Sequence, residues 1–296
     1  MKDRSVREFD GKFTPEEYFD KIEQAAGRWW FERYPAWAST YAQMTIDRND
    51  AALREIGTGD RILDIGCGLG DMLHLSRGQF RVRCGIDAVP EMAAASERNL
   101  TAKGASSDVF IKVATAEDLP FPDQHFDAVT LLDVYEHITP SHRATSLREI
   151  SRVLKADGRL VLATPSRPIL RFWQVVNGML SAPIHLIRQR PVHIWRFQQK
   201  DFTEQFCSRR ELLRDLRENG FDVDHVERVC FYPAPETTGF FGMCLQATMR
   251  WSPLHKLLNA GVRVFARIPI LRQKLLVRCS RSDSSNVIPT QKATAA

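Results

Sequence analysis

Three glycines, each separated by one residue, follow an apolar run that begins near residue 61. The segment 61–71 reads RILDIGCGLGD, so Asp64 precedes Gly66, Gly68 and Gly70. Glycine adopts positive φ readily and lets a ligand approach the backbone where no Cβ intrudes. An apolar stretch with helical potential follows, and a helix start offers unpaired N–H groups. The pattern therefore predicts a strand, a tight turn and a helix that hold a small molecule against the backbone.

The spacing of the glycines argues against a dinucleotide site, whose Gly-x-Gly-x-x-Gly pattern would need glycine where Asp71 stands. A plain glycine-rich turn is the simplest alternative. The order Asp-x-Gly-x-Gly-x-Gly resembles the first motif of class I S-adenosylmethionine-dependent methyltransferases. The resemblance implies S-adenosyl-L-methionine as the cofactor. It assigns the following residues to cofactor binding: Asp64, Gly66, Cys67, Gly68, Leu69 and Gly70.

An acidic residue, Asp87, ends the next predicted strand, about 20 residues beyond the glycines. A carboxylate in that place can accept hydrogen bonds from both hydroxyls of a ribose. The resemblance implies the same role and places Ala88 and Met92 near the adenine. A helix cap is the alternative role for an aspartate after a strand.

A further segment, 115–118, resembles the part of the family in which an Asp-Ala pair reads the adenine. Thr115 stands in the position of that aspartate, and Ala116 follows it. The backbone contact to the base is kept by this exchange, whereas the charged contact is lost. Glu117 or Asp118 could substitute for it, or belong to the solvated surface.

The predicted strand 126–132 runs into the segment 133–137, DVYEH. This segment resembles one found in the methyltransferase subgroup that includes the ubiquinone and menaquinone enzymes. It contains neither the Asn/Asp-Pro-Pro-aromatic motif of enzymes that act on DNA amino groups nor the Pro-Cys of 5-methylcytosine enzymes. Leu132 and Asp133 are expected beside the cofactor. His137 is a candidate base, because a neutral imidazole could take a proton from a substrate hydroxyl; a structural histidine is the alternative.

The segment 163–166, ATPS, resembles a turn that borders the acceptor pocket in the same subgroup. Residues beyond it are predicted to cover that pocket. His193 lies in this insertion and is a second candidate base.

These residues must be positioned by alternating strands and helices, which predict a parallel sheet with helices on both faces. Strands are expected at 61–65, 80–86, 109–113, 126–132, 159–163, 221–229 and 274–279. Helices are expected at about 90–100, 144–154 and 208–220. The resemblance implies an α/β, doubly wound, Rossmann-like fold with a seven-stranded, mostly parallel sheet whose last strand is antiparallel.

The ends of the chain and two insertions surround this predicted domain. Residues 1–54, with a helix start at Thr14–Glu17 and a cluster of aromatic residues, are expected to form a helical lid. Packing of those aromatics on the main domain is the alternative. The methyltransferase domain is expected at 55–281, with insertions at about 166–200 and 236–270. A disordered tail is expected at 282–296.

The net charge of +5 is unevenly distributed. Residues 166–200 contain six Arg and Lys and no acidic residue, and residues 240–281 contain eight and none. Such asymmetry indicates an anionic partner: a membrane surface, a phosphorylated substrate or nucleic acid. Residues 169–187 are long enough to test as a membrane span, but Arg171, Pro183 and His185 argue against one. An amphipathic segment in an interface and a segment that only covers the substrate are the two remaining interpretations.

Six scattered cysteines without a Cys-x-x-Cys pair indicate neither a zinc site nor a disulfide framework, so no metal is expected. The polar N-terminus lacks the apolar core of a signal peptide. We expect a cytoplasmic protein with reduced thiols; a peripheral position on the inner face of the membrane is the further option.

The expected function is S-adenosylmethionine-dependent O- or C-methylation of a hydrophobic or lipid-like small molecule by in-line methyl transfer. Two other functions stay open: a methyltransferase directed at nucleic acid, and a protein that binds S-adenosylmethionine without catalysis. The apolar character of the basic stretches argues against nucleic acid, whose binding face would expose polar and stacking residues.

Overall fold

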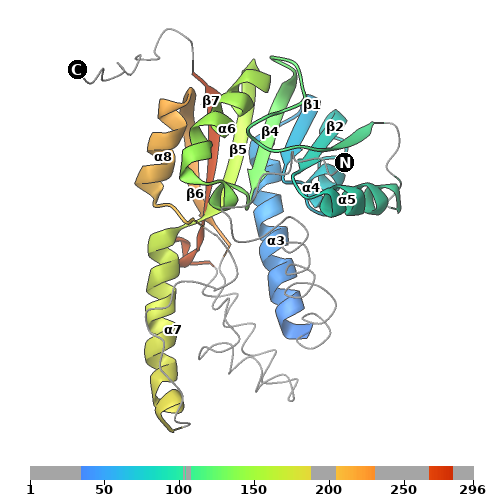
Figure 1. The fold of residues 1–296 in the computed structure, drawn as a ribbon. Helices are drawn as coiled ribbons and strands as arrows, with labels where there is room; N and C mark the ends of the chain where they lie inside the picture. Colours follow the sequence, from blue (N-terminus) through green and yellow to red (C-terminus); the bar gives the residue numbers. More distant parts are fainter. Residues whose placement is uncertain (1–34, 103, 105–107, 188–204, 231–266, 283–296) are drawn as a thin grey trace, which may run out of the picture.

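The computed structural model describes residues 35–102, 104, 108–187, 205–230 and 267–282 (Figure 1). Its centre is a seven-stranded sheet in the order β3-β2-β1-β4-β5-β7-β6. Strand β7 is antiparallel to both β5 and β6, and the other strand pairs are parallel. The sequence prediction of a doubly wound, mostly parallel sheet with an antiparallel last strand is confirmed.

The strands are β1 (Gly59–Ile65), β2 (Phe80–Asp87), β3 (Val109–Val113), β4 (Phe126–Leu132), β5 (Leu154–Pro165), β6 (Phe221–Val229) and β7 (Lys274–Arg281). The helices are α3 (Pro35–Ile56), α4 (Asp71–Leu75), α5 (Pro90–Ala102), α6 (Pro140–Val153), α7 (Arg167–Ile187) and α8 (Arg209–Glu218). Two short 3-10 turns are η1 (Tyr135–His137) and η2 (Pro269–Leu271).

The central strands are buried on both faces because helices cover each side. The carboxyl-terminal residues of β1 and β4 are continuously buried, as in parallel strands that are covered on both faces. On one face, Ala51, Ala52 and Ile56 of α3 pack in the core with residues of β4, β5 and β7. On the other face, a larger core cluster includes apolar residues of α6 and α8. This sandwich fixes the carboxyl ends of β1, β2 and β4 beside one another.

Helix α8 begins as its sequence predicts. Ser208 is the N-cap, its Oγ accepts from the Glu211 N–H at 3.3 Å, and the Glu211 carboxylate accepts from the Ser208 N–H at 2.6 Å. This reciprocal capping box satisfies two of the N–H groups that a helix start leaves without partners. Glu211 also accepts from Arg167 at the start of α7, so the two helix starts are tied together.

Two elements are longer than the sequence predicts. Helix α6 begins at Pro140 rather than near residue 144, because proline suits the first turn of a helix, where no N–H partner is required. Strand β5 begins at Leu154, whose side chain is buried and whose backbone pairs with Phe126. An irregularity between the pairs formed by Phe126 and Ala128 accommodates residues 155–158, KADG, whose lack of an apolar run hid this part of the strand.

Several sequence predictions lie outside the described residues. They are the helix start at Thr14–Glu17, His193, the second half of the first insertion, nearly all of the second insertion and the tail from residue 283. The lid is described only from residue 35 onward, so its function stays a prediction. None of the described helices has the length and apolarity needed to cross a membrane.

Candidate functional site

The glycine turn lies between β1 and α4, at the carboxyl edge of the sheet. Gly66, Gly68 and Gly70 all adopt positive φ, at 69°, 52° and 79°. The N–H groups of Gly66 and Cys67 both donate to the Ile86 carbonyl, at 2.8 and 2.9 Å. The turn is therefore fastened to the neighbouring strand β2, and its shape does not depend on a ligand.

Two of these glycines are required by packing, and the third is not. A Cβ at Gly66 would lie under 3.0 Å from Val134, and one at Gly70 would lie 2.6 Å from the Ser96 hydroxyl. A Cβ at Gly68 would meet only the Met92 methyl group, at 3.7 Å. The space above Gly68 is thus not filled by the protein, as expected where a ligand approaches the backbone.

This difference predicts two distinct effects of alanine. Gly68→Ala should fold, with a conformational cost of about 1–2 kcal/mol for the left-handed backbone, and should bind S-adenosylmethionine at least about tenfold more weakly. Gly66→Ala should lose about 2–4 kcal/mol of unfolding free energy, because overpacking adds to the same strain. Urea unfolding and calorimetric titration separate the two. Equal affinities of wild type and Gly68→Ala would show that no ligand approaches this glycine.

Asp87 ends β2 and contacts the turn directly. Its Oδ2 accepts from the Gly68 N–H at 3.0 Å, and its Oδ1 accepts from the Val89 N–H at 3.0 Å. Burial raises the pKa of this carboxyl, while the backbone hydrogen bonds lower it. Because each carboxylate oxygen has two lone pairs, each can still accept a hydroxyl of a bound nucleoside. Ala88 follows at the same edge, and Met92 lies in the first turn of α5.

Asp64 lies at the end of β1, buried under the turn. Its Oδ1 accepts from the Thr130 hydroxyl at 2.6 Å. Burial raises the pKa of this carboxyl to about 7, although the Thr130 hydrogen bond opposes the shift. A buried carboxyl of this kind would be stabilised in its ionised form by a positively charged group, such as the ammonium of an amino-acid tail.

The raised pKa of Asp64 predicts a specific pH dependence for the cofactor-free protein. The folded state holds the proton to about pH 7, whereas an unfolded aspartate releases it near pH 4. Stability should therefore fall as pH rises between about 4 and 7, by at most about 1.4 kcal/mol per pH unit. Asp64→Asn should remove this part of the slope in urea unfolding. Identical slopes in variant and wild type would contradict the prediction.

The segment 115–117 lies beside Asp87, because the Ala114 N–H donates to the Asp87 carbonyl at 3.1 Å. Ala116 is buried in the core. The Glu117 carboxylate lies 3.1 Å from the His142 ring nitrogen on α6. Glu117 therefore already has a partner of its own, which weakens its case as a substitute for the adenine-binding aspartate.

The other sequence-predicted cofactor residues also lie at this edge. Leu69 is half exposed on the turn, and its carbonyl accepts from the Asn99 side chain at 2.8 Å. Cys67 is buried, with its thiol 3.8 Å from the Ser96 hydroxyl, and burial raises the pKa of that thiol. Leu132 is buried at the end of β4. The fold thus gathers the predicted residues of β1, β2 and β4 and of the segment after β3.

Asp133 follows β4 in the left-handed conformation, at φ 60°. Its Oδ2 accepts from Arg48 Nη1 of α3 at 2.6 Å and also from Lys274 Nζ of β7. Burial raises the pKa of this carboxyl, but the charges of Lys274 and Arg48 outweigh that effect and bring it to about 2. Oδ1 is buried and has no hydrogen-bond partner in the described part of the chain. Asp133 is thus an ionised carboxylate that holds two cations beside the site.

His137 ends η1, close to Asp133 and Lys274. The pKa of its imidazole is lowered to about 4, chiefly by burial; the charge of Asp133 opposes this shift and that of Lys274 adds to it. The ring is therefore neutral at pH 7, as a general base must be. A pKa so far below the working pH makes it a weak base, which favours a structural or orienting role. His193, the second candidate base, lies outside the described residues.

Sequence reasoning missed Arg48 and Lys274. Arg48 lies in α3, within the range that the sequence predicts as a helical lid, and Lys274 begins the strand β7. A signal for Lys274 does exist in the sequence, since a lysine that opens an apolar strand run must be paired if it is buried. Its partner could not be inferred, because Asp133 lies far away along the chain.

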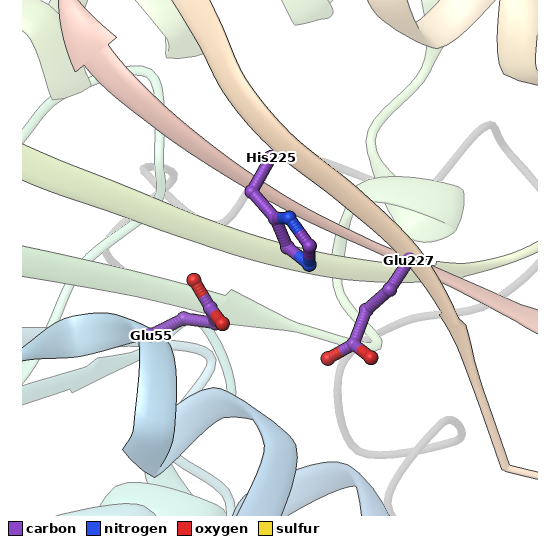
Figure 2. Close-up of side chains that lie close together, drawn as sticks. All are labelled: Glu55, His225 and Glu227. Carbon is purple, nitrogen blue, oxygen red and sulfur yellow. The ribbon is translucent and has the colours of Figure 1, made fainter.

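A second cluster of potential ligands lies away from the glycine turn, where the last turn of α3 meets the edge strand β6. Glu55, His225 and Glu227 point toward one another, with their ligand atoms within 4.8 Å (Figure 2). Both carboxylates already face guanidinium groups: Glu55 accepts from Arg278 at 2.9 Å, and Glu227 lies 3.6 Å from Arg54. These ion pairs account for the carboxylates, and the cluster does not support a metal proposal.

Comparison with known proteins agrees with this geometry. Residues 63–162, which run from β1 to β5, match the family model of a methyltransferase domain. In this region the chain is similar to the class I S-adenosylmethionine-dependent methyltransferases, and S-adenosyl-L-methionine is the methyl donor of that family. The space at Gly68, the carboxylate of Asp87 and the buried carboxyl of Asp64 fit such a cofactor.

Among curated relatives, the demethylmenaquinone methyltransferase of Symbiobacterium thermophilum is 31% identical over 176 residues, which cover 58% of this chain and 63% of the relative. The ubiquinone/menaquinone biosynthesis C-methyltransferase UbiE of Pseudomonas paraeruginosa is 36% identical over 39% of this chain and 46% of its own length. The chain therefore spans less than two thirds of these relatives. The YcgJ structure from Bacillus subtilis shares the fold, with a TM-score of 0.51 and 18% identity over 80% of this chain and 98% of that one.

Proposed function

We propose that this protein transfers a methyl group from S-adenosyl-L-methionine to a hydrophobic or lipid-like small molecule, at an oxygen or a carbon atom. The observation that carries the proposal is Asp87, whose carboxylate is held against the Gly68 N–H at the carboxyl edge of the sheet. That pairing places a hydrogen-bond acceptor for a ribose beside a backbone that a ligand can approach closely.

When bound, S-adenosyl-L-methionine supplies a methyl group on a positively charged sulfur that a nucleophile can attack. In our proposal Asp87 binds the ribose, and the buried carboxyl of Asp64 lies toward the amino-acid tail. Residues 115–117 and Leu132 would lie against the adenine and the amino-acid tail of the bound cofactor. Most of the acceleration would come from holding donor and acceptor in line, an effect of about 7–11 kcal/mol at best. Residues 1–54 would close over the site as a lid.

The acceptor side of the proposed site includes Asp133, His137 and Lys274. Lys274 brings a positive charge there, held in place by Asp133. A positive charge favours the ionised form of an acceptor hydroxyl, and this lowers the need for a strong base. The weakly basic His137 is then suited to orient the acceptor rather than to deprotonate it.

The class of acceptor is supported by the relatives and by composition. Two curated relatives are named for menaquinone or ubiquinone biosynthesis, in which the acceptors are hydrophobic quinone precursors. The acid-free stretches 166–200 and 240–281 combine aliphatic and basic residues. This composition suits an acceptor that is reached at an anionic membrane surface and a peripheral location of the protein there.

A methyl-transfer assay tests the proposal. The protein is incubated with S-adenosylmethionine that carries a radiolabelled methyl group and with a detergent-solubilised extract of lipids and quinones. The labelled product is then identified by mass spectrometry. We expect label in an organic-soluble product, and none with Asp87→Ala. Tight cofactor binding without transfer to any acceptor would favour a protein that only binds S-adenosylmethionine, and transfer to nucleic acid alone would overturn the acceptor class.

A further inference from the structure

Four large apolar side chains are exposed on α7 and on the segment that leads into β7. On α7, Phe172 is 51% exposed and Met179 is 63% exposed; beside η2, Ile268 is 40% and Ile270 is 67% exposed. Phe172 and Met179 are seven residues apart and so lie on the same side of the helix. Exposed apolar side chains that gather in one region indicate an interaction surface.

A direct contact joins the two segments. Trp173 packs edge-on against Phe172, with ring centroids 5.5 Å apart, and its indole N–H donates to the Leu271 carbonyl of η2 at 3.2 Å. The first turns of α7 are therefore fixed to the segment that carries Ile268 and Ile270. We call these four exposed residues, Phe172, Met179, Ile268 and Ile270, the apolar surface.

Basic residues accompany this surface, and acidic residues are missing from both segments. Arg171 lies beside Phe172, and Arg267 lies beside Ile268; both side chains are exposed. Arg228 of β6 donates to the Ile270 carbonyl at 3.1 Å. Neither 166–200 nor 240–281 contains an Asp or a Glu, although the rest of the chain carries all 36. Glu227 of β6 lies near Ile270, together with Arg228 and Arg272. An apolar surface whose neighbours are mainly basic is complementary to an anionic lipid interface.

The position of α7 relates this surface to the cofactor edge of the sheet. Helix α7 follows directly after β5, whose carboxyl end lies at the same edge as the glycine turn. It then extends away from the sheet, beyond that edge (Figure 1). At 21 residues, it is about 30 Å long. Since it is not apolar enough to span a bilayer, it is suited to lie along one.

We propose that the apolar surface docks on an anionic lipid bilayer, so that α7 lies along the lipid beside the carboxyl edge of the sheet. The inference rests on the proposed function, because it supplies the route by which a lipid-like acceptor reaches the cofactor. A protein partner would also bury apolar side chains. The lack of acidic residues in 166–200 and 240–281 favours a lipid interface over a protein partner, because an anionic bilayer attracts arginine over its whole surface.

Vesicle flotation of the full chain tests this docking. Wild type is mixed with phosphatidylcholine vesicles, with or without phosphatidylglycerol, at low and high salt. We expect flotation with the anionic vesicles at low salt, and markedly less with neutral vesicles or at high salt. Met179→Ser combined with Ile270→Ser should reduce binding at least about tenfold, because two apolar side chains no longer enter the interface. Arg267→Gln should reduce binding to anionic vesicles only.

A matched control is the double substitution Phe110→Ser and Val113→Ser. These residues are exposed to a similar degree on β3, at the other end of the sheet from β7 and β6. The control should float like wild type. Failure of wild type to float, or equal flotation of the Met179/Ile270 variant, would overturn the proposal.

Methyl transfer in the detergent extract separates this proposal from the proposed function. The Met179/Ile270 variant should retain that activity, because detergent presents the acceptor without a bilayer. Flotation without any methyl transfer would count against the enzymatic proposal and leave the docking supported. If the Met179/Ile270 variant loses both flotation and methyl transfer and its unfolding curve changes, the substitutions act through folding. That result would count against the docking surface.

Discussion

Asp87→Ala is expected to weaken S-adenosylmethionine binding by about 10²–10⁴-fold. The estimate follows from two hydrogen bonds to a charged acceptor, each contributing about 1.5–3 kcal/mol. The carboxylate is half enclosed, and its oxygens already hold the N–H groups of Gly68 and Val89. Its removal therefore takes away the proposed ribose contact and also loosens the turn that carries Gly68. Isothermal titration of wild type and variant with S-adenosylmethionine and S-adenosylhomocysteine measures the loss.

Two controls make this result specific. Asp123→Ala removes a carboxylate that is 73% exposed and paired with Arg152 on the surface, and it should leave cofactor affinity unchanged. Asp87→Asn keeps the shape of the side chain. It should be less destabilised than Asp87→Ala but should still bind S-adenosylmethionine weakly. A loss of less than about fivefold in Asp87→Ala would mean that the ribose is held elsewhere.

The places of the proposed cofactor residues in the fold could be predicted from sequence because their determinants are local. Gly66, Gly68 and Gly70 act through their own backbone conformation, and Asp87 ends the strand that follows. Parallel strands bring their carboxyl ends to one edge, so the order of the elements alone places these residues together. The strand boundaries could also be predicted, because apolar runs are local signals. The predicted first and last residues of β3, β4 and β6 agree with the structure.

The partners of Asp133 on the proposed acceptor side could not be predicted, because they are distant in sequence. Arg48 is 85 residues from Asp133 along the chain, and Lys274 is 141 residues away. They meet Asp133 only because α3 crosses the sheet and β7 is inserted between β5 and β6. The low pKa of His137 is likewise a consequence of burial, which the sequence of η1 does not reveal. Sequence reasoning made this histidine a candidate base with a structural role as the alternative, and the lowered pKa favours that alternative.

Asp133→Asn is expected to lower the unfolding free energy by about 3–5 kcal/mol at neutral pH. The substitution keeps the size of the side chain, and asparagine tolerates the left-handed backbone at this position. It removes the negative charge that compensates both Lys274, whose side chain is 8% exposed, and Arg48. Removing one partner of a buried ion pair leaves uncompensated charge, which is the strongly destabilising case. Urea unfolding at constant ionic strength measures the change.

A surface pair provides the matched control. Asp60 also faces two arginines, Arg61 and Arg81, but its side chain is 40% exposed. Asp60→Asn should therefore leave the unfolding free energy nearly unchanged, because solvent screens an exposed ion pair. Adding Lys274→Met to Asp133→Asn should restore part of the loss, because one of the two uncompensated charges is then absent. Similar losses of unfolding free energy in Asp60→Asn and Asp133→Asn would show that burial does not strengthen the ion pairs of Asp133.

The pH dependence identifies the charge of Asp133 as the cause. The pKa of this carboxyl is about 2 in the folded protein and about 4 in an unfolded chain. A lowered pKa means that the stabilisation is fully present above pH 4 and is lost as pH falls toward 2. The difference between wild type and Asp133→Asn should therefore be constant from neutral pH down to about 5 and should shrink below that. A difference that persists unchanged at low pH would assign the effect to packing rather than to charge.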